Sequence, residues 1–158
     1  VFVLSEPKGP FPPEDRLELA RLACREFPNV SVHPTQGYLI SNATFPTYFL
    51  KDRNRGGEIH CELDLEIFAG RFAPALHLKK RFEGTEPLDP VTRRYNEAMH
   101  AFLPGRGIAM IEIPRLKVGG EPVSASRVRA HWTAGDLQSV RDLVPAATYD
   151  YLKLKIGG

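Results

Sequence analysis

The chain is poor in cysteine and in net charge, and it has no long apolar run. Its two cysteines, Cys24 and Cys61, are too few for a disulfide framework and lack the spacing of a metal site. A formal net charge of +2 gives no reason to expect a nucleic-acid-binding surface. No run of about 18 apolar residues occurs, so no segment is predicted to span a membrane. We therefore expect a cytoplasmic protein with neither a nucleic-acid nor a membrane partner.

The chain also lacks an initiating methionine. It begins with VFVLSEP, residues 1–7, an apolar run typical of a buried strand, and no basic stretch precedes this run as a secretory signal would require. Its 158 residues suit one domain with a sizeable core. We therefore expect residues 1–158 to be a single domain that is truncated at its N-terminus.

Strand and helix patterns alternate along the chain. Residues 58–76 fit both an alternating strand and a helix, and their length favours the helix. Strands are predicted within residues 1–7, 29–35, 79–87 and 107–115, with a further short strand at 38–40. Helices are predicted over residues 11–27, 58–76, 89–105, 124–135 and 136–152. The alternation predicts an α/β domain with a mainly parallel sheet, whose ligands bind where the strands end.

The segment EPVSASRVRAHW, residues 121–132, places two serines and two arginines at the start of a predicted helix. A helix start leaves backbone N–H groups unpaired and carries partial positive charge, so it attracts anions. Ser124 and Ser126 would add hydroxyl donors, and Arg129 a forked guanidinium suited to phosphate. The same residues also fit a serine N-cap followed by solvated arginines. The spacing leaves both interpretations open.

A second candidate residue is Lys8, which lies in the Pro- and Gly-rich segment SEPKGPFPPEDR after the first predicted strand. A lysine in a loop is usually a solvated surface residue. Its importance as a cation therefore depends on this loop meeting the serine-arginine helix.

Two other clusters have simpler explanations. HCELDLE, residues 60–66, combines a histidine, a cysteine and three acids, but scattered acids usually form a solvated face. The histidines lack ligand spacing, and Cys61 and His60 point in different directions as sequence neighbours, so neither a metal site nor a thiol nucleophile is predicted. The aromatic cluster TFPTYF, residues 44–49, would line an acyl or pantetheine pocket or, by default, pack in the core.

Four segments resemble the nucleotidyltransferase domain of the citrate lyase ligase family, also called acetate:citrate lyase acyl-carrier-protein ligases. They are YLISNATFPTYFLKD, FAPALHLKKRFEGTEPLDPVTRRYNEAM, IPRLKVGGEPVSASRVR and LVPAATYDYL, and the likeness extends over nearly the whole chain. VSASRVR is also similar to the Ile-Ser-Ser-(Ser/Thr)-x-x-Arg motif of the wider superfamily, with Ala125 replacing one serine. The resemblance implies a Rossmann-like nucleotidyltransferase fold for residues 1–158.

The same resemblance implies an adenylate-forming ligase. ATP and acetate would form acetyl-adenylate and pyrophosphate, and the acetyl group would pass to the prosthetic-group thiol of the citrate lyase acyl carrier protein. Ser124, Ser126 and Arg129 would hold the ATP phosphates. Lys8 and Arg129 would act in catalysis by neutralising phosphate charge, with Mg2+ on the triphosphate. Three further residues, in segments typical of the family, would contact the nucleotide: Glu86, Arg93 and Asn96.

One signature of the family is absent. Such enzymes carry His-x-Gly-His after their first strand, and no two histidines of this chain have that spacing. The resemblance therefore implies that the first, central strand lies before Val1 and that the sheet without it has two unpaired inner edges. The chain by itself is therefore expected to be catalytically incomplete. Two alternative functions stay open: a non-catalytic nucleotide-binding fragment, and a different nucleotidyltransferase that makes a dinucleotide cofactor.

Overall fold

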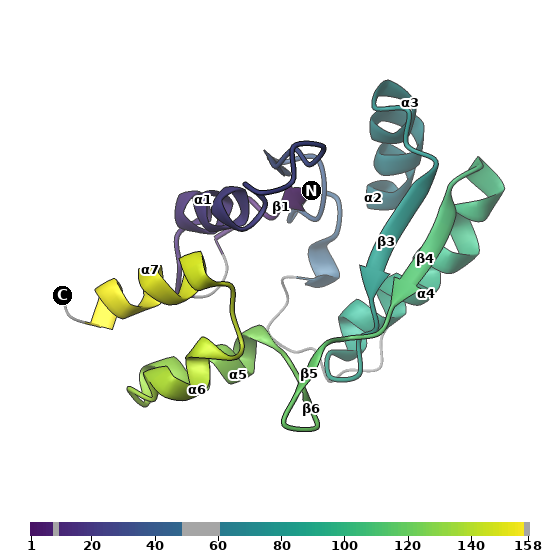
Figure 1. The fold of residues 1–158 in the computed structure, drawn as a ribbon. Coiled ribbons are helices and arrows are strands. Elements are labelled where there is room, and N and C mark those ends of the chain that lie inside the picture. The colour runs from purple at the N-terminus through teal and green to yellow at the C-terminus, as the bar shows by residue number, and fades with distance from the viewer. Residues whose placement is uncertain (8–9, 49–60, 157–158) are drawn as a thin grey trace.

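A computed structural model describes residues 1–7, 10–48 and 61–156 of the chain. It begins with a small strand–helix–strand unit (Figure 1). Strand β1 (Phe2–Val3) pairs in parallel with β2 (His33–Pro34), and helix α1 (Pro13–Ala23) lies between them in sequence. Pro13 suits the first turn of α1, which also carries two acids near the positive end of the helix.

A second parallel pair of strands is longer, and a cavity described below opens where its strands end. Strand β3 (Lys80–Gly84) pairs with β4 (Ala109–Ile113), with Lys80 opposite Ala109 and Gly84 opposite Ile113. Helix α4 (Pro90–Phe102) and the 3-10 turn η3 (Pro104–Arg106) connect the two strands. The predictions of both strands and of this helix are confirmed.

The polypeptide between the two pairs is mainly helical in its described part. It contains the short 3-10 turn η1 (Pro46–Tyr48) and then one continuous helical segment. That segment comprises α2 (Glu62–Ile67), the π-helical turn η2 (Phe68–Phe72) and α3 (Ala73–Ala75). The helix predicted over 58–76 is thus confirmed for its described residues.

The final part of the chain is a hairpin followed by three helices. Strands β5 (Lys117–Val118) and β6 (Glu121–Pro122) pair antiparallel around two glycines. Both glycines have positive φ, which glycine adopts without steric cost. Helices α5 (Ala125–Thr133), α6 (Leu137–Arg141) and α7 (Ala146–Ile156) follow. Helix α7 packs beside α1, where the Tyr151 hydroxyl donates to Asp15 (Figure 1).

Two predicted elements are wrong. The single helix expected over 136–152 is divided into α6 and α7, because Pro145 lacks an N–H and disfavours helical geometry in the residue before it. The short strand expected at 38–40 is a turn instead. Gln36 and Ile40 both have positive φ, at 54° and 48°, which is incompatible with a strand.

The α/β class is confirmed, but the described strands do not form one sheet. They form three separate pairs, two of them parallel. One face of the β3–β4 pair contributes Met110 to the hydrophobic core, whereas the opposite face leaves Phe82 59% and Ile113 50% exposed. The core itself lies between α4 and the helical segment 62–75, and its largest members include Phe45, Phe68 and Leu103. None of the described helices has both the length and the apolar character to cross a membrane.

Candidate functional site

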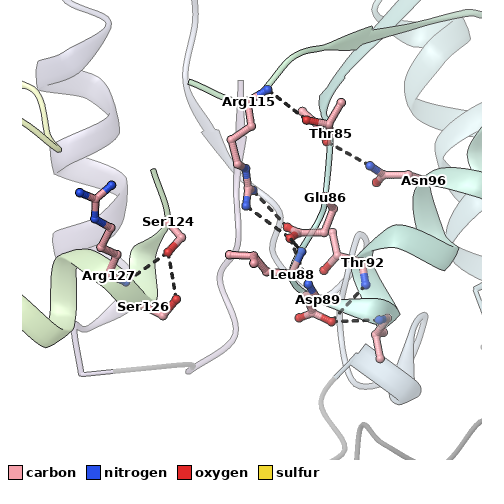
Figure 2. Close-up of polar contacts among 12 residues, drawn as sticks. Thr85, Glu86, Leu88, Asp89, Thr92, Asn96, Arg115, Ser124, Ser126 and Arg127 are labelled. Atoms are coloured by element: carbon pink, nitrogen blue, oxygen red, sulfur yellow. Dashed lines mark hydrogen bonds and ion pairs between the residues drawn. The ribbon is translucent and has the colours of Figure 1, made fainter. Parts of the chain in front are cut away.

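Ser124 is the N-cap of α5. Its backbone is extended and its hydroxyl oxygen accepts a hydrogen bond from the Arg127 N–H at 3.2 Å (Figure 2). The Ser126 hydroxyl lies 3.0 Å from that of Ser124. The serine N-cap is therefore confirmed. The N–H groups of Ala125 and Ser126 make no hydrogen bond to any described residue, as is usual at the start of a helix.

The two arginines of this helix have different roles. Arg127 donates from Nη1 to the carbonyl oxygens of Val118, at 2.9 Å, and of Glu121, at 3.3 Å. Its Nε lies 3.7 Å from the Glu121 carboxylate, so the side chain braces the β5–β6 hairpin. Arg129 is exposed and makes no polar contact within the described ranges. Since residues three apart share a helix face, Arg129 and Ser126 lie on the same face of α5.

Glu86 is tied to protein partners on both of its oxygens. Its Oε1 accepts from the backbone N–H groups of Leu88, at 2.9 Å, and Asp89, at 3.1 Å. The Arg115 guanidinium meets both oxygens, with Nη1 3.3 Å from Oε1 and Nη2 3.1 Å from Oε2 (Figure 2). The Arg115 N–H also donates to the Thr85 hydroxyl. The Glu86 side chain is only 8% exposed as a result.

The start of α4 lies directly after this turn. Asp89 is its N-cap and accepts from the N–H groups of Val91, at 2.9 Å, and Thr92, at 3.4 Å, with Pro90 in the first helical position. Cap and proline both follow the pattern predicted from the sequence.

A cavity of about 640 Å³ opens beside α4, where β3 and β4 end. The buried Asn96 donates from Nδ2 to the Gly84 carbonyl oxygen at 3.1 Å, whereas Arg93 is exposed. The structure thus brings together the three residues that the sequence placed near the nucleotide. The lining consists of Thr85, Glu86, Pro87, Arg93, Asn96, Glu97, His100 and Glu112.

Lys8 lies outside the described residues, but both flanks of its loop are anchored. On one side, Arg16 donates to the Glu6 carbonyl oxygen at 2.6 Å. On the other side, the Phe11 ring packs against Trp132 of α5, with 5.3 Å between the ring centroids. Phe11 therefore contacts α5 near its C-terminal end, whereas Ser124 and Ser126 stand at its start, and the role of Lys8 stays a prediction.

His100, which lines the cavity, pairs with a buried carboxylate. Glu83 on β3 has a side chain only 7% exposed, and His100 Nε2 lies 2.7 Å from its Oε1. Burial raises the pKa of Glu83, and the neighbouring Glu112 carboxylate raises it further, while His100 and Arg81 oppose the shift. The net direction is upward from the ordinary glutamate value of 4.5.

This shift predicts a pH-dependent stability. The folded state holds the Glu83 proton more tightly than the unfolded state does. The stabilisation that Glu83 contributes to the folded state is therefore present below pH 4.5 and is lost as the pH rises through the folded pKa. We expect Glu83→Gln to remove that loss, and thus to flatten the pH dependence measured by urea denaturation from about pH 4 to about pH 7. Glu97→Gln, an exposed change on α4, is the control. Equal slopes for wild type and Glu83→Gln would contradict the assignment.

Asp64 was missed in the sequence, where its acidic segment was interpreted as a solvated face. That interpretation is wrong for Asp64, which is fully buried, although its neighbours Glu62 and Glu66 are exposed. The Asp64 carboxylate accepts from the Thr44 hydroxyl at 3.1 Å, from the Tyr95 hydroxyl and from the Ile40 N–H. Burial and this carboxylate raise the pKa of Tyr95. The network joins the 40–44 turn to α2 and α4.

The two remaining clusters of the sequence are the aromatic residues 44–49 and the segment around Cys61. Phe45 is fully buried, as the core interpretation predicted, and its ring centroid lies 4.7 Å from that of Tyr95 with the two rings tilted by 36°. Burial and acidic neighbours raise the pKa of the Cys61 thiol to about 11, which disfavours its reactive thiolate. Among the described residues, no three His, Cys, Asp or Glu side chains are grouped as metal ligands. His60 lies outside the described residues.

Fold and site together define a small α/β domain whose polar groups gather where β3 and β4 end and where α4 and α5 begin. The segment 116–123, which contains β5 and β6 and is called the hairpin arm below, connects the polar residues beside α4 with those at the start of α5. The Val123 N–H closes this arm by donating to the Leu116 carbonyl oxygen at 2.8 Å. A family model described as the citrate lyase ligase C-terminal domain matches residues 1–152, and the chain belongs to that family.

Three curated relatives are similar over almost the whole chain, and each is named citrate (pro-3S)-lyase ligase. The protein of Klebsiella pneumoniae is 42% identical over 96% of this chain and 46% of its own length. That of Escherichia coli K12 is 40% identical over 97% and 45%, and that of Haemophilus influenzae 36% over 97% and 47%. The chain thus spans about half the length of the curated relatives it matches.

Proposed function

We propose that this chain is the nucleotide-handling part of an adenylate-forming ligase that acts in the cytoplasm. ATP and acetate would give acetyl-adenylate and pyrophosphate, and the acetyl group would then pass to the prosthetic-group thiol of the citrate lyase acyl carrier protein. Family membership supports the ligase class. The observation that supports the site is the α5 start, where neither the first N–H groups of a capped helix nor Arg129 has a polar partner among the described residues.

In the first step, an acetate oxygen would attack the α-phosphorus, and the bond to the β-phosphate would break with its electron pair leaving on pyrophosphate. The leaving group gains negative charge in this step. Arg129 and the Ser126 hydroxyl would bind the phosphates at the α5 start and stabilise that charge, and Lys8 would add a second cation. In the second step, the thiol sulfur would attack the acetyl carbon and AMP would leave.

Mg2+ would arrive on the triphosphate and neutralise part of its charge. This ion keeps several waters and needs only one or two protein carboxylates, so it does not require a cluster of three ligands. Besides Glu86, whose oxygens are already bonded, the cavity lining offers two carboxylates, Glu97 and Glu112.

The cavity beside α4 would hold the rest of the nucleotide. Arg93 is the exposed member of the three residues assigned to nucleotide contact, so it would touch the ligand directly. Glu86 and Asn96 are buried and already bonded, so they would form the wall and hold the backbone around the ligand.

Acetate-dependent release of pyrophosphate from ATP tests this function. With Mg2+ and ATP, and with the His-x-Gly-His segment that this chain lacks supplied, we expect pyrophosphate release only when acetate is added, because acetate is the attacking group. A nucleotidyltransferase that makes a dinucleotide cofactor would instead release it with a mononucleotide and without acetate. A non-catalytic fragment would bind ATP and release none. Either of these two results would overturn the ligase proposal for this chain.

A further inference from the structure

Arg115 links two parts of the site that are distant in sequence. It follows β4 and meets both carboxylate oxygens of Glu86, which lies in the turn between β3 and α4. Its own N–H donates to the Thr85 hydroxyl at 3.0 Å, so side chain and backbone hold the same turn. Among the described residues, this is the most buried pairing of an arginine with a carboxylate, with side chains 29% and 8% exposed.

On its other side, Arg115 leads directly into the arm that carries α5. The next residue, Leu116, accepts from the Val123 N–H, and Val123 precedes the cap residue Ser124. Arg127 closes the arm by donating to the Val118 carbonyl oxygen. Hydrogen bonds and chain neighbours together therefore connect the Glu86 turn to the start of α5, and Figure 2 shows the two ends of this connection, Arg115 on Glu86 and Arg127 on Ser124.

We propose that Arg115 is a positioning residue that fixes the start of α5 relative to the 85–89 turn and the cavity beside α4. A nucleotide that uses both places needs them at one separation, and this ion pair sets it. The inference rests on the proposed function, because it assigns the phosphates to α5 and the remainder of the nucleotide to the cavity. Removing Arg115 would leave a buried Glu86 carboxylate with backbone partners alone, and the turn would shift to reach water.

The test compares ATP affinity, by calorimetry with Mg2+, in Arg115→Ala, Glu86→Gln and the double variant. We expect each single variant to weaken ATP binding by about ten- to a hundredfold, since small displacements of binding groups cost that much. The double variant should be little worse than either, because both changes break one interaction. Arg115→Lys should lie between, since lysine lacks the fork that meets two oxygens. Arg106→Ala breaks the exposed pair with Glu66 and should leave the affinity unchanged.

Hydrogen exchange without ligand separates this inference from the proposed function. Arg115→Ala should accelerate exchange of the Leu88 and Val123 amides together, because both report on the linked segments. If wild type binds no ATP but this joint acceleration occurs, the proposed function fails and the coupling stands. If Arg115→Ala binds ATP as wild type does, or if only one segment responds, Arg115 does not position the site.

Discussion

Replacing Asp64 with alanine is expected to lower the free energy of unfolding by about 3–5 kcal/mol. The change leaves the Thr44 hydroxyl, the Tyr95 hydroxyl and the Ile40 N–H without their shared acceptor in a buried site. For a chain of this size, such a loss lowers the melting temperature by roughly 10 °C or more. Urea denaturation and thermal unfolding both measure it.

Two further variants test whether the network explains the loss. Tyr95→Phe removes one donor and leaves the carboxylate with two, so its cost should be smaller, about 1–2 kcal/mol. Glu62→Ala changes an exposed acid of the same helix and should cost no more than about 0.5 kcal/mol. If Asp64→Ala and Glu62→Ala were equally stable, the buried network would not hold the 40–44 turn to α2 and α4.

Replacing Arg129 with alanine is expected to weaken ATP binding tenfold or more, equivalent to the roughly 1.5–3 kcal/mol of a charged hydrogen bond. Arg129 is the exposed arginine of α5 without a polar partner among the described residues, so its guanidinium is available for phosphate. Calorimetry with Mg2+ measures the affinity. Arg129→Lys should keep part of it, because lysine retains the charge but lacks the planar fork.

The matched control is Arg25→Ala, which removes an exposed arginine outside the site. It should bind ATP as wild type does. Arg129→Ala should also unfold at close to the wild-type temperature, since its exposed side chain makes no polar contact with the described residues. Unchanged ATP affinity in a folded Arg129→Ala sample would mean that the α5 start serves only as a helix cap.

The distinction between Arg127 and Arg129 shows how much of a binding site a sequence pattern can predict. Both residues stand in one short motif. No rule of spacing predicts that Arg127 bonds the hairpin while Arg129 has no polar partner among the described residues. The separation arises from the β5–β6 hairpin, whose carbonyl oxygens lie within reach of Arg127. Similarly, Glu86 and Arg115 are 29 positions apart, and only the parallel register of β3 and β4 brings them together.

By itself, the sequence determined the features that depend on bonds between near neighbours. These include the Asp89 cap, the order of the main helices and strands, and the glycine turn of the hairpin, whereas the Ser124 cap was one of two interpretations that the spacing left open. The resemblance to citrate lyase ligases could also be found from the sequence, because those segments are specific. Tertiary structure alone decided that Asp64 is buried rather than solvated and that Arg115 is paired. The physical reason is that burial and ion pairing depend on which elements pack together, and that packing brings together residues far apart in the chain.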